Sequence, residues 1–234
     1  MSSENPFPPV GAAALAAAAL LSSAGIASAG GGRLLVFVHV AVKQRALQTL
    51  LQSALPGLTV TTVGRVADFD RALEEGQDAV LTLPIVLLAR GLAPKLRGLR
   101  GGSPDEAYSL VGADSAPDPA SAKIVGALDL LGREGTTGFV QGLLGAKPRV
   151  ERVTKVEDLL PLLQMQRADT LLLPSRLFAE IKSTSSLNVV QRELPGKVGL
   201  PAVATVNDAG ASVLTEIGKL SSEAARALGV ESWR

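Results

Sequence analysis

The residues best placed for chemistry lie in one polar bend between two apolar stretches. The run KIVGALDLLG ends at Gly132, the bend REGTT follows, and apolar spacing resumes at Phe139. One physical explanation is that the bend exposes the amino end of a helix, where unpaired backbone N–H groups can hold an anion. Thr136 or Thr137 could equally cap that helix without touching any ligand. Other motifs of the sequence are needed to distinguish anion binding from helix capping.

Other polar or turn-forming residues fall at the ends of apolar strands. His39, the sole histidine, lies close to the end of the run 34–40, Thr82 and Pro84 end the run 78–84, and Pro174 and Ser175 end the run 169–175. Open parallel sheets bind ligands beyond the carboxyl ends of their strands, so all five residues are candidates for a binding site. A packed core histidine and ordinary turn chemistry are the alternatives.

Short β-rich runs alternate with helical patterns along most of the chain, which predicts α/β units with largely parallel sheets. The segment 112–122 is rich in Ala, Pro, Ser and Asp, and we expect it to be a boundary between two lobes. A single C-terminal helix is expected to carry the apolar residues from Val213 to Leu228 on one face, with Trp233 as a late anchor. The expected strands cover residues 34–40, 58–64, 78–84, 108–112, 123–131, 149–154, 169–175, 187–194 and 200–206.

Composition excludes several classes of function. The chain has 234 residues, 47% of them apolar, which is enough for a substantial core. Its 23 basic and 22 acidic residues nearly cancel and only 3% of residues are aromatic, so we expect no nucleic-acid partner. Cysteine is absent, and the sequence contains neither HExxH, GxSxG nor a Walker motif. We therefore expect no enzyme activity, no metal site and no cofactor.

The N-terminal segment has the pattern of an export signal. Residues 11–29 are apolar and Ala-rich, and they end in Ala27-Ser28-Ala29, the small-x-small pattern that a signal peptidase accepts. We predict a signal peptide over residues 1–29 and a periplasmic location. No Lys or Arg precedes the apolar run, so an uncleaved membrane anchor or a flexible tail is the alternative.

The order of motifs resembles the type II periplasmic substrate-binding proteins of ABC transporters, in particular the phosphate and phosphonate-binding branch. The resemblance covers roughly residues 33–234. It includes the first strand and helix over 34–55, YSLVG at 108–112, the stretch with the polar bend, EDLLPLLQ before DTLLLPS, and the return VGLPAVATV followed by LGVESW. It rests on order and spacing more than on any diagnostic signature.

The resemblance implies a two-lobed type II periplasmic-binding-protein-like fold, each lobe a mostly parallel sheet flanked by helices. Lobe 1 would span 33–112 plus 200–234, and lobe 2 would span 120–198, with the ligand in a cleft that closes by hinge bending. In this family a Ser/Thr-rich turn grips an anionic ligand, and Gly135, Thr136 and Thr137 occupy its place. Arg133 could add charge, or could pair with Glu134 in solvent.

The resemblance further implies an exported monomer that captures a small anionic or polar molecule, such as a phosphate or phosphonate, for an ABC permease. Contact with a membrane would come only through the signal or anchor. The alternative is an envelope interaction or sensing protein on the same scaffold, with a decayed ligand site. An aminoalkyl ligand is disfavoured, because the strand ends offer Pro84, Pro174 and Ser175 in place of acidic and aromatic groups.

Overall fold

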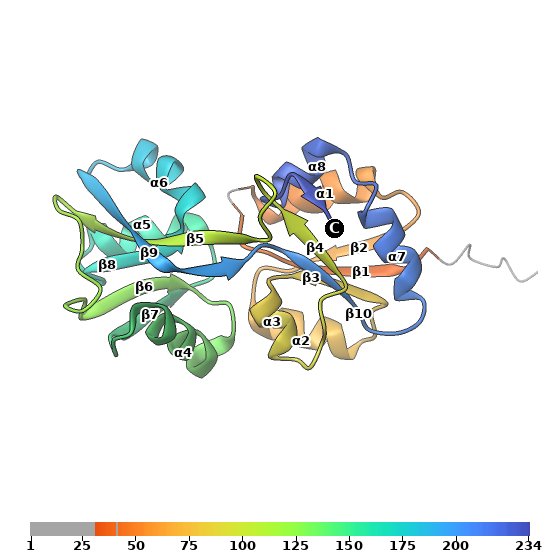
Figure 1. Ribbon diagram of the computed structural model, residues 1–234, viewed down its shortest axis with the longest axis horizontal. Helices are drawn as coiled ribbons and strands as arrows, with labels where there is room; N and C mark the ends of the chain where they lie inside the picture. Colours follow the sequence, from red (N-terminus) through yellow and green to blue (C-terminus); the bar gives the residue numbers. More distant parts are fainter. Residues whose placement is uncertain (1–30, 41) are drawn as a thin grey trace, which may run out of the picture. The chain divides into compact units, whose positions relative to one another are not determined.

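The computed structural model describes residues 31–40 and 42–234. The predicted signal peptide lies outside the described residues. Two β-sheets organise the fold, each flanked by helices, and each defines one lobe (Figure 1). No helix among the described residues is both long and apolar enough to cross a membrane.

Lobe 1 contains a six-stranded sheet in the order β11-β4-β10-β3-β1-β2. The strand β1 pairs in parallel with both β2 and β3, whereas β10 runs antiparallel to β3 and β4. Its strands are β1 (Arg33–Phe37), β2 (Thr59–Thr62), β3 (Ala79–Thr82), β4 (Leu96–Leu99), β10 (Ala202–Thr205) and β11 (Ser232–Trp233), and its helices are α1 (Gln44–Ala54), α2 (Val66–Glu74), α3 (Pro84–Leu88), α7 (Gly210–Ile217) and α8 (Ser222–Ala227).

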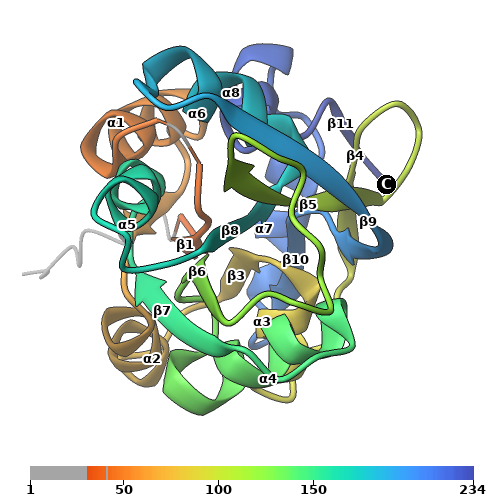
Figure 2. The ribbon, with the colours of Figure 1, turned by 90° about the vertical axis from the view of Figure 1, so that its left-hand side faces the viewer.

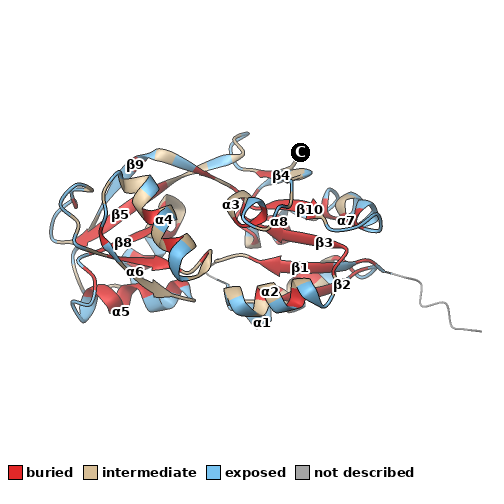
Figure 3. Cartoon of the chain, turned by 90° about the horizontal axis from the view of Figure 1, so that it is seen from below, coloured by how far each residue is buried: buried red, intermediate tan, exposed pale blue. Residues whose placement is uncertain are grey.

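The apolar run of β1 supplies both faces of this sheet, because successive side chains of a strand point in opposite directions. Leu34 and Val36 pack with residues of α1, α7 and α8, while Leu35 and Phe37 pack with residues of α2 and α3. All four side chains are buried, and the burial of β1 and β3 is visible in Figure 3. The continuous hydrophobicity of the run thus follows from helices on both sides.

Lobe 2 contains a five-stranded sheet in the order β7-β6-β8-β5-β9. The helix α4 covers one face, and α5 and α6 cover the other (Figure 2). Its strands are β5 (Asp105–Ala113), β6 (Ile124–Leu128), β7 (Arg149–Val153), β8 (Thr170–Pro174) and β9 (Val189–Gly199), and its helices are α4 (Gly132–Leu144), α5 (Leu159–Gln164) and α6 (Phe178–Thr184), with single 3-10 turns η1 (Val156–Asp158) and η2 (Ser175–Leu177).

The long antiparallel strands β5 and β9 lead into and out of lobe 2. They pair along most of their length, from Asp105 with Gly199 to Ala113 with Val189. Next to them, the amide of Leu200 donates to the carbonyl oxygen of Pro104 at 2.7 Å, so the two crossings between the lobes are tied together.

Three sequence predictions differ from the observed elements. The residues 105–113 belong to the sheet of lobe 2, because β5 pairs with β8 and β9, whereas the sequence placed residues up to 112 in lobe 1. Segment 112–122 therefore connects β5 to β6 within lobe 2. The expected C-terminal helix is interrupted between Ile217 and Ser222, and β4, which pairs with β10 and β11, is not among the expected strands.

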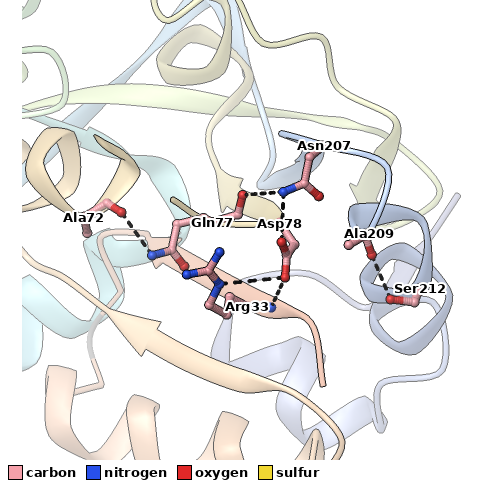
Figure 4. A network of polar contacts seen from close by, with 7 residues as sticks. All are labelled: Arg33, Ala72, Gln77, Asp78, Asn207, Ala209 and Ser212. Atoms are coloured by element: carbon pink, nitrogen blue, oxygen red, sulfur yellow. Dashed lines mark hydrogen bonds and ion pairs between the residues drawn. The ribbon is translucent and has the colours of Figure 1, made fainter. Parts of the chain in front are cut away.

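A polar network fixes the returning strand β10 at the amino ends of the strands in lobe 1 (Figure 4). The carboxylate of Asp78 accepts from the side-chain amide of Asn207 at 2.9 Å and from the backbone amide of Arg33 at 2.7 Å. The bond from Asn207, followed by that from Arg33, lowers the pKa of Asp78. The network stabilises the end of the sheet opposite the strand tips where a ligand is expected.

Candidate functional site

A cavity of about 680 Å³, called here the cleft cavity, lies at the carboxyl ends of strands from both lobes. From lobe 1 it is lined by Val36 and residues 38–40 at the end of β1, by residues 62–64 at the end of β2, and by the first turns of α1. From lobe 2 it is lined by residues 154–157, which follow β7. The position agrees with the rule that α/β sheets bind ligands beyond their strand tips.

Positive charge surrounds the cleft cavity. The lining includes Lys43, Arg45 and Lys155, and the sole carboxylate among the lining residues described is that of Glu157. All four side chains are exposed, and none takes part in an ion pair with another residue of the described part of the chain. Unpaired cations around a concave surface favour an anionic ligand.

The amino end of α1 adds to this positive potential. The first backbone bond of the helix runs from the amide of Leu47 to the carbonyl of Lys43, so the amides of the first turn have no acceptor within the helix. The N-cap residue Lys43 makes no side-chain cap, and no acidic residue lies in the first turn. The helix therefore presents free N–H groups and its positive dipole end at the cavity wall.

Two glutamines of α1 also line the cavity, but their amide groups are already used. Gln44 donates to the carbonyl of Thr62 at 2.7 Å, and Gln48 accepts from the amide of Thr62 at 2.7 Å. These bonds hold the edge strand β2 against α1.

His39 is the one sequence-predicted site residue that lines the cleft cavity. It also lines a small enclosed cavity of about 10 Å³ between the lobes, together with Pro174. Burial lowers the pKa of His39 to about 4, and the nearby carboxylate of Asp129 opposes this shift only in part. The imidazole is therefore neutral at pH 7.

The predicted polar bend is the beginning of α4. The fully buried hydroxyl of Thr136 accepts from the amides of Leu130 and Leu131 at 3.1 and 3.0 Å and donates to Asp129 at 3.0 Å. Asp129 also forms an ion pair with Arg152. Thr136 therefore bonds two backbone amides that precede the helix, whereas the N-cap residue is Leu131 and α4 has no side-chain cap.

The neighbours of Thr136 also serve the helix. Thr137 donates to the carbonyl of Arg133 at 2.7 Å, one turn earlier. Gly135 lies so close to Leu131 that an added Cβ would come within 2.6 Å of that side chain, and the side chain of Arg133 is exposed. None of these residues is among those lining the cleft cavity.

The remaining predicted residues lie at strand ends but outside the cleft cavity. Thr82 is fully buried, and its hydroxyl has no partner among the described residues. Pro84 begins α3, and Pro174 pairs with Tyr108 inside the sheet of lobe 2. The hydroxyls of Ser175 and Ser109 are 2.7 Å apart and bond to each other.

The cations of the cleft cavity were not among the site residues predicted from the sequence. Lys43 and Arg45 begin the helix that follows the first strand, and Lys155 follows a strand of lobe 2, so their positions after strand ends were a usable signal. That signal is weak, because exposed basic residues at the start of a helix are common on any protein surface.

No protein-family model and no curated protein matches this sequence. Similar folds exist among solved structures. The arginine-bound Gly52Ala mutant of ArgBP from T. maritima is 17% identical, with a TM-score of 0.53 over 85% of this chain and 95% of that one. The periplasmic VFT2 domain of BvgS from Bordetella pertussis is 11% identical, with a TM-score of 0.54 over 86% and 93%. A periplasmic His/Glu/Gln/Arg/opine family-binding protein from Silicibacter pomeroyi, in complex with lysine, is 13% identical, with a TM-score of 0.52 over 85% and 89%.

These similarities confirm the fold class expected from the sequence. The described residues have the two-lobed α/β fold of type II periplasmic solute-binding proteins. Both sheets are mixed, because the crossing strands β5 and β9 and the returning strand β10 pair antiparallel. The three structures are described as an arginine-bound protein, a periplasmic VFT domain and a lysine complex, and none of these descriptions mentions phosphate or phosphonate. Sequence identities this low support a shared fold only, so the ligand has to be inferred from the site itself.

Proposed function

We propose that this chain is an exported, non-enzymatic solute-binding protein that captures a small anionic or polar molecule in the cleft cavity and delivers it to an ABC permease. The observation that carries the proposal is the set of three unpaired cations, Lys43, Arg45 and Lys155, around a cavity at the strand tips. The free amides at the amino end of α1 support the same ligand charge.

Ligand capture is tested by thermal shift and calorimetry with the full chain. The panel contains inorganic phosphate, methylphosphonate, methanesulfonate, short carboxylates, and the amino acids arginine, lysine and glutamine. A binder raises the melting temperature, because a ligand held only by the native state adds RT ln(1 + [L]/Kd) to the free energy of unfolding. The phosphate and phosphonate prediction is one arm of this panel, and the amino acids are another.

Single substitutions then locate the site. Lys43→Gln, Arg45→Gln and Lys155→Gln should each weaken anion binding by about 3- to 10-fold, because exposed charge pairs contribute modestly. Lys147→Gln is the matched control, since Lys147 is exposed and lies outside the cavity lining. Equal affinities for all four variants would move the site elsewhere, and the predicted contacts of Gly135, Thr136, Thr137 and Arg133 would be tested next.

The alternative is an envelope protein that uses the scaffold for sensing or protein contact. Its support is the similarity to the periplasmic VFT2 domain of BvgS. If no member of the panel raises the melting temperature at millimolar concentration, ligand capture is refuted and this alternative gains.

A further inference from the structure

His39 lies at the junction of the two lobes. It follows β1 of lobe 1 and lines both the cleft cavity and the small enclosed cavity, which we call the interlobe seam. Its ring meets that of Phe37 edge-on at a centroid distance of 5.0 Å. Its Nε2 atom is buried and has no hydrogen-bond partner among the described residues.

The far wall of the interlobe seam belongs to lobe 2 and is mainly apolar. Leu128, the last residue of β6, and Leu130 line the seam together with Tyr108 of β5. One apolar cluster runs across the junction and contains Phe37 of lobe 1 as well as Leu128 of lobe 2. An imidazolium in this place would lose its hydration without gaining an acceptor at Nε2.

Two carboxylates near the seam could neutralise a charged His39, and each of them already binds another residue. Asp129 is bound to Arg152 and Thr136, and Oε2 of Glu106 accepts from Nε of Arg176 at 2.8 Å, while the buried Oε1 of Glu106 has no partner among the described residues. The titratable and charged groups that face His39 from all the elements around it are Lys43 and Arg45 of α1, Glu106 and Tyr108 of β5, Asp129 after β6, Lys155 and Glu157 after β7, and Arg176 of η2.

We infer that His39 is a proton-operated switch of lobe closure, which lets the lobes meet when it is neutral and drives them apart when a proton from solvent binds its ring. The release of ligand on acidification rests on the proposed function, whereas the movement of the lobes depends only on the seam. Opening returns the imidazolium to water, so the proton and the closed arrangement compete for the same side chain.

The size of the effect follows from the two environments of the ring. Burial lowers the pKa of His39 to about 4 in the closed arrangement, and an exposed histidine titrates near its usual value. The closed state is fully favoured above about pH 6.5 and is progressively lost as the pH falls toward 4. With these values, closure becomes about 30-fold less favourable between pH 7.5 and pH 5.

Glu106 works in the opposite direction. Burial raises its pKa, with the charge of Arg176 opposing, so protonation of Glu106 favours the buried arrangement. A variant without His39 should therefore show a slight closing on acidification in place of opening. The opposite direction of the two pH effects on lobe closure distinguishes His39 from Glu106.

The movement can be measured without any ligand. The chain has no cysteine, so Leu88→Cys in lobe 1 and Met165→Cys in lobe 2 accept a donor and an acceptor dye at defined places. These side chains are 64% and 71% exposed. The efficiency of energy transfer should change between pH 7.5 and pH 4.5, because opening alters the distance between the two dyes. His39→Gln and His39→Phe should abolish this opening. Constant transfer in the parent, or the same opening in both variants, would overturn the inference.

Ligand affinity provides a second readout, with methanesulfonate as the probe because its charge is constant over this pH range. Binding should be weaker at pH 5 than at pH 7.5, by up to about 30-fold, because affinity follows the fraction of molecules in the closed state. Tighter binding at pH 5 would indicate a direct contact between the anion and charged His39 and would refute the switch. Opening without binding of any panel member would instead refute the proposed function and leave the switch standing.

Discussion

Three glutamines of α1 take the place of a neighbouring strand at the edge of the sheet in lobe 1. The strand β2 is at that edge and, within residues 31–40 and 42–234, pairs only with β1. Gln44, Gln48 and Gln52 are spaced by four residues and so lie in one row of the helix. The row bonds the outward-facing backbone groups of Leu58, Val60 and Thr62.

The central glutamine carries the sharpest prediction. Gln48 accepts from the amide of Thr62 at 2.7 Å and donates to the carbonyl of Val60, and both of these residues are buried. Gln48→Met keeps the length of the side chain and removes both bonds. At about 1 kcal/mol for each bond, the free energy of unfolding should fall by about 2 kcal/mol.

The assay is unfolding in urea and by heat. For a chain of this size, the loss corresponds to a decrease of about 4 to 8 °C in melting temperature. Gln141→Met in α4 is the matched control, because Gln141 makes no side-chain hydrogen bond to another described residue. If both variants keep the parental stability within about 0.5 kcal/mol, the glutamine row does not stabilise the edge. Aggregation of Gln48→Met alone would agree with the reasoning, since exposed strand edges pair with other chains.

Two further predictions concern buried polar groups. Thr136→Val should lower the free energy of unfolding by about 1 to 3 kcal/mol, because it leaves two amides without an acceptor, whereas Thr137→Ala should change it by less than about 0.5 kcal/mol. Equal losses in urea unfolding would contradict this role of the Thr136 hydroxyl. Arg176→Met should cost about 3 to 5 kcal/mol at pH 8, because it leaves the buried Glu106 carboxylate unpaired. Part of that loss should be recovered at pH 5, since burial raises the pKa of Glu106 and its protonated form suits the native state; a loss independent of pH would contradict this explanation.

Most of the fold could be predicted from local patterns. The apolar run of β1 and the spacing of Leu47 and Leu51 in α1 reflect burial against neighbours on known faces, so periodicity located these elements. The strand β4 was not predicted, because Leu96–Leu99 contains Arg97 and Gly98 and owes its conformation to pairing with β10 and β11. Sheet membership of β5 likewise depends on partners distant in sequence.

The sequence predicted the kind of site, a helix amino end beside a strand, but not which helix provides it. A helix amino end next to an apolar strand was expected to hold an anion, and the cleft cavity has such an end in α1. The sequence pointed to α4, because Thr136 and Thr137 look like donors for a ligand. A threonine near a helix start is compatible with both roles, and the choice depends on whether its hydroxyl meets the chain's own amides. The hydroxyl of Thr136 bonds the amides of Leu130 and Leu131, which precede the helix, and the sequence does not reveal these partners.

The position of His39 explains why one residue can matter for both affinity and closure. A side chain that only touched the ligand would be pointed into the open cleft cavity, where water competes for it. His39 lines both cavities, and its Nε2 is buried without a hydrogen-bond partner among the described residues, so its charge is costly only while the lobes are together. Because a group changes an equilibrium only by the difference between its free energies in the two states, this burial gives His39 control over closure that the exposed cations Lys43, Arg45 and Lys155 lack.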